Sequence, residues 1–108
     1  MGEHNIIYNV TIKVDKDVEQ EWCQWMKEKH IPDVISTGCF MECRFNKVLF
    51  FDDEEGAMYT AQYLSENMSK LQEYQGTHAL ILQKKHQDKY KDQYVAFRSV
   101  MEVIEKYN

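Results

Sequence analysis

Hydrophobic and polar residues alternate near the start of the chain. Over residues 6–14, polar side chains largely separate apolar ones at every second position, those of Ile6, Tyr8, Val10, Ile12 and Val14. A period of two is typical of a strand with one buried face. The pattern therefore predicts a first strand over residues 6–14.

The period then changes to that of a helix. Apolar residues recur at steps of three and four, namely Val18, Trp22, Trp25 and Met26, and form one stripe on a helix. Asp17 followed by Gln20 fits a capping box at its start. We expect the helix to end near His30, because Pro32 disfavours helical geometry at the preceding residue. A turn at Thr37-Gly38 follows.

The rest of the chain predicts two strands, a helix and a last strand. The strands are expected over residues 39–51 and 57–64, a helix that opens at residues 65–67 continues to Lys89, and the last strand covers residues 94–104. Gly76 inside this helix costs about 1 kcal/mol of helix stability. The order βαββαβ predicts an α+β, ferredoxin-like sandwich as a single domain of residues 1–108, with an antiparallel sheet and both helices on one face.

The last predicted strand is apolar on both faces. Val95, Phe97 and Met101 alternate with a second apolar row that begins at Tyr94 and Ala96. Helices cover only one face of such a sheet, and exposing the other apolar row to water is unfavourable. We therefore expect a homodimer joined through the sheet faces. The alternative is an amphipathic C-terminal tail.

Candidate site residues lie on the expected inner faces of both helices and on the first strand. His30 and His78 are the candidates for proton transfer, because imidazole titrates near neutral pH. We expect an apolar pocket between helices and sheet, with ligand-binding residues Asn9, Trp22, Trp25, Tyr74 and His78. Burial in the core is the alternative role for the tryptophans and for His78, and helix capping is the alternative for His30.

Other chemistry has weaker support in the sequence. We expect Arg98 to pair with Glu42 or Glu102 at the dimer face, the alternative being a ligand carboxylate. The histidines and cysteines show no metal-ligand spacing, so no metal site is expected. No glycine-rich phosphate loop is present.

Composition narrows the classes of partner. The 108 residues carry a net charge of −5, with 13 basic and 18 acidic side chains, which disfavours nucleic acid as a partner. No apolar run is long enough for a membrane span, and no basic start leads into a signal segment. Cys23, Cys39 and Cys43 are odd in number and are expected to be reduced thiols. We therefore expect a cytoplasmic protein.

Several segments together resemble a family of small uncharacterised bacterial proteins. They are Tyr8-Asn9-Val10-Thr11, the Trp22–Val34 segment with its His30-Ile31-Pro32-Asp33-Val34 run, Thr37-Gly38, Tyr90 and the Val95–Ile104 run. The family is placed in the dimeric α/β-barrel superfamily, whose members pair two ferredoxin-like sheets. The resemblance implies this fold and a dimer, and it implies no activity.

Related members of that superfamily suggest possible chemistry. They include cofactor-independent monooxygenases, muconolactone-isomerase-like enzymes and haem-degrading monooxygenases. Asn9 resembles the first-strand asparagine of the haem degraders, and Tyr74 with His78 or His86 resembles their aromatic residue and histidine. Their histidine follows the aromatic residue by ten positions, where this chain has Lys84, so no haem or other cofactor is expected.

Three functions remain open at this point. The first is a homodimer that binds a small aromatic molecule, and the second is a cofactor-independent monooxygenase- or isomerase-like enzyme that uses His78 or His30. The third is a structural dimer without a ligand. The sequence does not identify a substrate.

Overall fold

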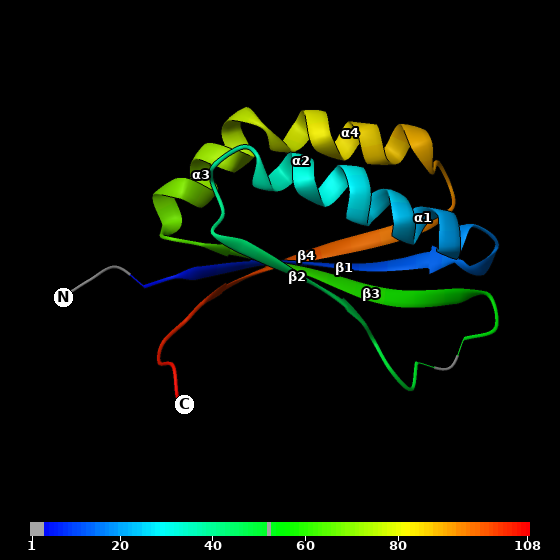
Figure 1. Ribbon diagram of the computed structural model, residues 1–108, viewed down its shortest axis with the longest axis horizontal. Coiled ribbons are helices and arrows are strands. Elements are labelled where there is room, and N and C mark those ends of the chain that lie inside the picture. Colours follow the sequence, from blue (N-terminus) through cyan, green and yellow to red (C-terminus); the bar gives the residue numbers. More distant parts are fainter. Residues whose placement is uncertain (1–3, 52) are drawn as a thin grey trace.

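Four strands form one antiparallel sheet, and two helical segments cover one of its faces (Figure 1). The computed structural model describes residues 4–51 and 53–108. In chain order the elements are β1 (Ile6–Asp15), the 3₁₀ turn η1 (Lys16–Val18), α1 (Glu19–Trp25), the π-helical turn η2 (Met26–His30), α2 (Ile31–Ile35), β2 (Glu42–Lys47), β3 (Gly56–Ser65), α3 (Met68–Thr77), α4 (Ala79–Lys89) and β4 (Tyr94–Glu102). The predicted α+β, ferredoxin-like order is confirmed.

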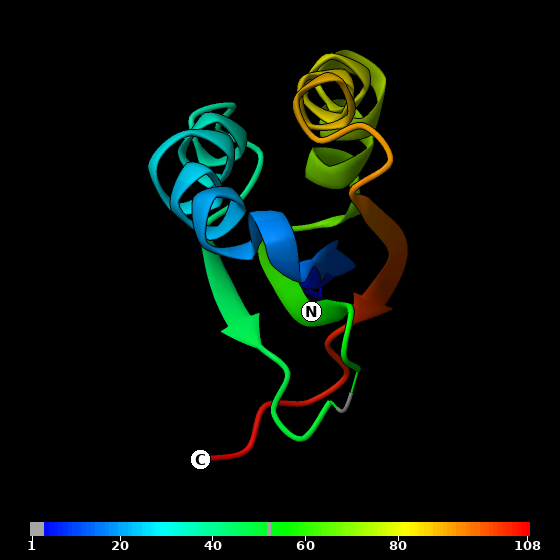
Figure 2. The ribbon, with the colours of Figure 1, turned by 90° about the vertical axis from the view of Figure 1, so that its right-hand side faces the viewer.

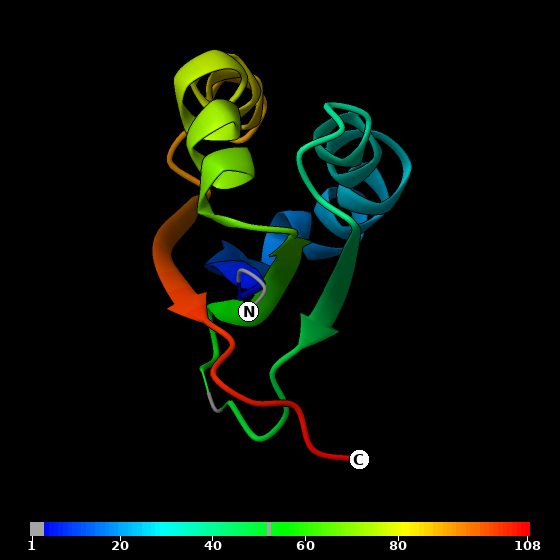
Figure 3. The ribbon, with the colours of Figure 1, turned by 90° about the vertical axis from the view of Figure 1, so that its left-hand side faces the viewer.

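The strand order is β2-β3-β1-β4, so β1 and β3 form the centre of the sheet. Val10 lies opposite Ala61 on β3 and opposite Arg98 on β4. Figures 2 and 3 show the α1–α2 segment and the α3–α4 segment side by side over the same face. The other face, called the open face below, carries no helix in the described part of the chain.

The core lies between the helices and the inner face of the sheet, and it is rich in aromatic residues. Trp22 on α1 is completely buried and packs against Tyr59 and Phe45. Tyr59 also donates a hydrogen bond of 2.5 Å to Glu19, which ties β3 to the start of α1. The alternation of β1 determines this arrangement, because its even-numbered residues all point toward the helices.

The first helical segment continues past the proline. Helical structure extends to Ile35, so the predicted end near His30 is wrong. Pro32 follows the π-helical turn η2 and lies in the first turn of α2. Proline is tolerated at such a position because the first amides of a helix turn need no partner within it. Asp17 lies in η1 and is not the N-cap of α1.

The second helical segment is broken at His78. α3 ends at Thr77, and His78 adopts φ −117° and ψ −32° before α4 begins. The sequence predicted one continuous helix, although Gly76 lies close to the break. Asn67 caps α3, because its side chain accepts a hydrogen bond of 3.0 Å from the amide of Lys70. The predicted opening at residues 65–67 is confirmed.

The edge strands are shorter than predicted. β2 covers six residues where a strand over residues 39–51 was expected, and β4 ends at Glu102. Phe50 has a positive φ of 60°, which takes the chain out of extended geometry. Gly38 lies in the expected turn with a φ of 79°.

Candidate functional site

Two histidines meet between the helical segments. His30 ends η2 and His86 lies on α4, and their ring centroids are 5.4 Å apart. Trp25 stacks near both rings, at 5.0 Å from His30 and 5.5 Å from His86. Tyr94, the first residue of β4, stacks on His86 at 4.0 Å. We call Trp25, His30, His86 and Tyr94 the imidazole cluster.

The tautomer of His86 is determined by Trp22. The indole Nε1–H of Trp22 donates a hydrogen bond of 2.9 Å to Nε2 of His86. Nε2 therefore carries no proton, and the proton of the neutral ring lies on Nδ1. The bond joins α1 to α4 within the core, where both residues are buried.

Both histidines are held neutral. Burial lowers the pKa of His30 to about 4, with Asp33 opposing this effect and Arg98 adding to it. Burial lowers the pKa of His86 to about 3, and the charge that His30 carries when protonated and the charge of Arg98 act in the same direction. At neutral pH the pair therefore offers uncharged imidazoles that can donate or accept a hydrogen bond.

Arg98 is the cation whose charge contributes to lowering the pKa of both histidines. It lies on β4 opposite Val10, which places its side chain on the helix-facing side. No ion pair joins it to any residue within the described ranges. Glu42 pairs with Arg44 at 3.4 Å and Glu102 with His4 at 3.3 Å. Within one chain, the predicted pairing of Arg98 with Glu42 or Glu102 therefore does not form.

A small cavity and a larger groove meet at Arg98. The cavity has a volume of about 30 Å³ and is lined by His30, His86, Arg98, Tyr74 and residues of the sheet. The groove, of about 410 Å³, runs between α4 and β4. Gln83 and Arg98 line both spaces. Ligand sites usually measure about 300–1,000 Å³, so the groove has the volume for a small molecule and the cavity alone does not.

A second groove of about 410 Å³ opens on the outer side of the histidines. It lies between the two helical segments and includes Trp25, His30 and Asp33. His30 lines both this groove and the cavity. The imidazole cluster is therefore approached from two sides.

The predicted site residues are separated by the fold. His30 and Tyr74 line the cavity, and Trp25 lies beside it in the imidazole cluster. Trp22 is a core residue that reaches the site through its bond to His86. Asn9 does not converge on the cavity, because it lies on the open face and bonds Thr11 there at 3.1 Å.

His78 does not approach His30 as predicted. It lies at the junction of α3 and α4, where its ring is 6.3 Å from that of Tyr74. Its nearest potential metal-ligating neighbours are Cys39 and Glu73.

His86 and Arg98 are absent from the predicted ligand-binding residues, although a ligand carboxylate was the alternative partner for Arg98 and His86 was an alternative to His78 in the resemblance. His86 lies eight positions after His78, and eight steps of a continuous helix turn the side chain by only about 80°. Either histidine could therefore have faced the core. The signal for Arg98 was its place among apolar residues of β4, but its register was needed to show what it faces.

The sheet and its two helical segments define an α+β protein of the ferredoxin-like class. The chain belongs to the family described as a domain of unknown function (DUF4286), which matches residues 5–104. The resemblance to a family of uncharacterised proteins is confirmed. Among curated proteins no relative matches this chain.

Several solved structures share the fold at low sequence identity. A putative antibiotic biosynthesis monooxygenase from Bacillus cereus has a TM-score of 0.69 at 8% identity, covering 97% of this chain and 98% of that one. A Bacteroides thetaiotaomicron protein of unknown function, called a possible oxidoreductase, also has a TM-score of 0.69 at 11% identity, with coverages of 94% and 99%. A dimeric ferredoxin-like protein from an uncultured marine organism has a TM-score of 0.64 at 11% identity, with coverages of 95% and 98%.

These likenesses establish the fold. At such identities the activities of the neighbours do not transfer to this chain. No helix within residues 4–51 and 53–108 has the length and hydropathy that a membrane crossing requires. No disulfide joins Cys23, Cys39 or Cys43 in the structure.

Proposed function

We propose that this protein is a homodimer that binds a small aromatic carboxylate in each subunit, in the groove between α4 and β4. The observation that carries the proposal is Arg98, a cation without a carboxylate partner among the described residues, at the point where groove and cavity meet. A guanidinium group binds a carboxylate with two parallel hydrogen bonds. The anionic end of the ligand would therefore lie on Arg98.

The surroundings of Arg98 favour a planar organic anion over a simple ion. Tyr94 lines the groove, and His86 stacks on the tyrosine ring. Gln83, which lines both spaces, offers an amide for hydrogen bonding. The groove also contains Lys91 and Asp92, whose charges offset each other, so Arg98 supplies its net positive charge. An aromatic ring could lie along Tyr94 while its carboxylate reaches inward.

The dimer would form through the open face. Val95, Phe97 and Met101 point to this side and are 66%, 61% and 40% exposed. The open face also holds the buried Oδ1 of Asn9, which has no hydrogen-bond donor among the described residues. The residues after β2 and the C-terminal tail both extend beyond this face (Figures 2 and 3), and they carry the exposed Phe50.

A second copy is the occupant that fits these features. The exposed apolar row of β4 is unfavourable in water, and a second sheet would bury it. Some structural neighbours are described as dimeric ferredoxin-like proteins, which supports this arrangement. The free thiols agree with a reducing compartment, and the ligand would then be a cytoplasmic metabolite.

A second candidate function is proton transfer on the bound molecule, as in a cofactor-independent monooxygenase or isomerase. The observation that favours it is the pair of neutral imidazoles beside Arg98. With pKa values of about 4 and about 3, however, His30 and His86 are weak bases at neutral pH. A bound carboxylate would offset the charge of Arg98 and so raise the pKa values of both histidines. Ligand binding is therefore needed for the binding function and for proton transfer alike.

Ligand binding is tested by equilibrium titration of matched compounds. We expect benzoate and hydroxybenzoates to change the tryptophan fluorescence, while the uncharged benzamides bind at least tenfold more weakly. Arg98→Gln should weaken binding of the carboxylates at least tenfold. Arg44→Gln is the matched control, because Arg44 is an exposed arginine on the opposite edge of the sheet. Equal affinities of the Arg98→Gln variant and the wild type would refute the proposal.

The dimer is tested by sedimentation at micromolar concentration. We expect wild-type protein to sediment as a dimer and Phe97→Glu to shift it to the monomer. Leu80→Glu is the control, because Leu80 is also apolar and exposed but lies on α4, away from the open face. A monomeric wild-type protein, or a dimer that Phe97→Glu leaves intact, would contradict this part of the proposal.

A further inference from the structure

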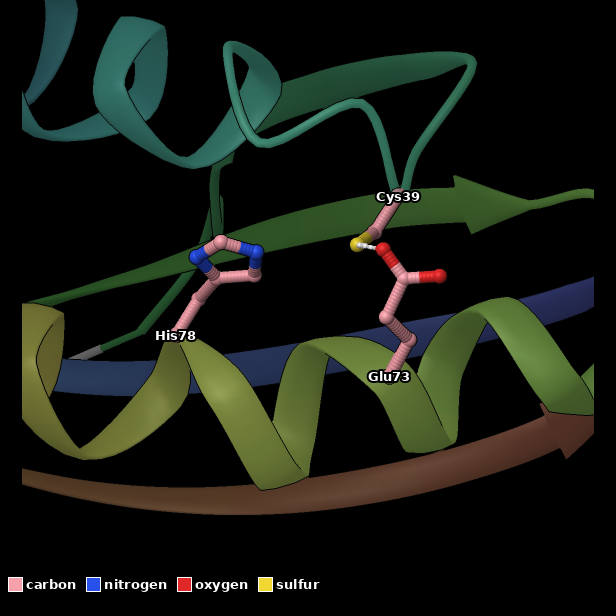
Figure 4. A group of neighbouring side chains, drawn as sticks. All are labelled: Cys39, Glu73 and His78. Atoms are coloured by element: carbon pink, nitrogen blue, oxygen red, sulfur yellow. Dashed lines mark hydrogen bonds between the residues drawn. The ribbon is translucent and has the colours of Figure 1, made fainter.

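Three side chains of different chemistry converge at the junction of α3 and α4. Cys39 comes from the segment between α2 and β2, Glu73 from α3, and His78 from the break between α3 and α4 (Figure 4). Each offers one potential ligand atom, and these atoms lie within 4.8 Å of one another. The thiol of Cys39 and Oε2 of Glu73 are 3.6 Å apart. The three residues lie outside the cavity and both grooves described above.

The separations suit a tetrahedral metal ion. Bonds of about 2.0–2.3 Å to nitrogen, oxygen and sulfur place the ligand atoms roughly 3.3–3.7 Å from one another. The sulfur-to-oxygen distance already falls in this range. The ligand atoms now lie up to 4.8 Å apart. The longest of these distances would have to shorten by roughly 1 Å to fit tetrahedral coordination. Glu73 is exposed and His78 is only half-buried, so side-chain rotation can supply this movement.

We propose that Cys39, Glu73 and His78 form a zinc site. A thiolate, an imidazole and a carboxylate are the ligand types that Zn²⁺ takes in proteins. Three protein ligands leave the fourth tetrahedral position to water, which is the pattern of a site with an open coordination position. The site is independent of the ligand groove, because Arg98 and the imidazole cluster take no part in it.

The site lies at the irregular junction of α3 and α4. Residues five positions apart on a continuous helix point about 140° apart, so Glu73 and His78 would not share a ligand. At His78 φ is −117°, although its amide still bonds the carbonyl of Tyr74 at 2.9 Å, and the imidazole lies close to Cys39 and Glu73 (Figure 4). The carbonyl end of α3 also lies here, and its partial negative charge favours a cation.

Two neighbours compete with a metal for Glu73. Nζ of Lys70 lies 3.9 Å from Oε1, on the other oxygen of the carboxylate. The thiol of Cys39 can instead donate a hydrogen bond to Oε2. A hydrogen bond between the thiol and the carboxylate, without a metal, is therefore the alternative explanation. The experiment must distinguish this hydrogen bond from a zinc site.

Cobalt is the spectroscopic probe for the site. Full-length protein, freed of metal with a chelator and without a histidine tag, is titrated with Co²⁺. We expect one equivalent per chain, visible absorption of tetrahedral intensity, and a thiolate-to-cobalt charge-transfer band that Zn²⁺ abolishes. Cys39→Ser should remove the charge-transfer band. Glu73→Gln and His78→Ala should each weaken Co²⁺ binding at least tenfold.

A matched cysteine and a stability measurement control for misfolding. Cys43→Ser, which changes a partly buried thiol outside the proposed site, should retain the full cobalt spectrum. Zinc at about 100 times its dissociation constant should raise the unfolding temperature by roughly 10 °C, in the wild type and in Cys43→Ser but not in His78→Ala. The proposal is overturned by the absence of a tetrahedral cobalt spectrum, or by unchanged affinity in both Glu73→Gln and His78→Ala. Loss of the band in Cys43→Ser with its retention in Cys39→Ser would overturn it equally.

Discussion

The two neutral histidines make the stability of this protein depend on pH. Burial lowers the pKa of His30 from 6.5 to about 4 and that of His86 from 6.5 to about 3. Both residues are therefore neutral in the folded state at pH 5, whereas in the unfolded chain they are protonated. Since the unfolded state binds more protons below pH 6.5, the free energy of unfolding falls as the pH is lowered.

The magnitude follows from the linkage relation. Between pH 7.5 and pH 5, a histidine with an unfolded pKa of 6.5 that stays neutral when folded loses about 2 kcal/mol of stability. The pair should lose about 4 kcal/mol, a large part of the roughly 5–15 kcal/mol of an ordinary domain. Carboxylates with lowered pKa values, such as Glu19 and Asp53, contribute mainly at lower pH.

The assay is urea unfolding followed by circular dichroism at fixed protein concentration across this pH range. His30→Gln and His86→Gln should each reduce the loss of stability by about 2 kcal/mol, and the double variant should reduce it by about 4 kcal/mol. The side-chain oxygen of Gln at position 86 can still accept the hydrogen bond of the Trp22 indole, so we expect the His86→Gln variant to keep the fold. A double variant whose stability falls as steeply as that of the wild type would refute the assigned protonation states.

Three further substitutions test single contacts. Trp22→Phe should destabilise the protein by about 3 kcal/mol in urea unfolding, because it removes buried volume and leaves Nε2 of His86 without its donor; a change below about 1 kcal/mol would contradict this. Asn67→Ala should cost about 1 kcal/mol, because it removes the cap that bonds Lys70, whereas Asn67→Asp, which keeps the acceptor, should cost less. Gly38→Ala should cost about 1 kcal/mol, since φ at this position is 79°; an unchanged thermal midpoint would show that the turn relaxes.

The elements with a regular period could be predicted from the sequence. β1 alternates over most of its length, and the outward row of β4 proved exposed, as the apolar character of both faces of this strand suggested. Irregular positions were predicted less well. Pro32 is accommodated within the first helical segment by a π-helical turn. Phe50 adopts a positive φ although no glycine or proline beside it predicts a turn.

The candidate site was only partly predictable. His30 and Tyr74 were placed at the cavity by their helical positions, and both line it. His86 and Arg98 were not, because their roles depend on a break in the helix and on the register of β4 against β1. Cys39, Glu73 and His78 lie on three segments that no local pattern connects.

The amino-acid sequence by itself determined which segments become strands and helices, and which of their faces are apolar. These properties depend on the order of polar and apolar residues over one or two turns, and that order is local. Only the tertiary structure decided that His30 contacts His86, what Arg98 faces, and which side chains lie close to Cys39. Such contacts depend on irregular backbone positions and on the pairing of strands that are distant in sequence. A shift of one residue in that pairing changes every contact.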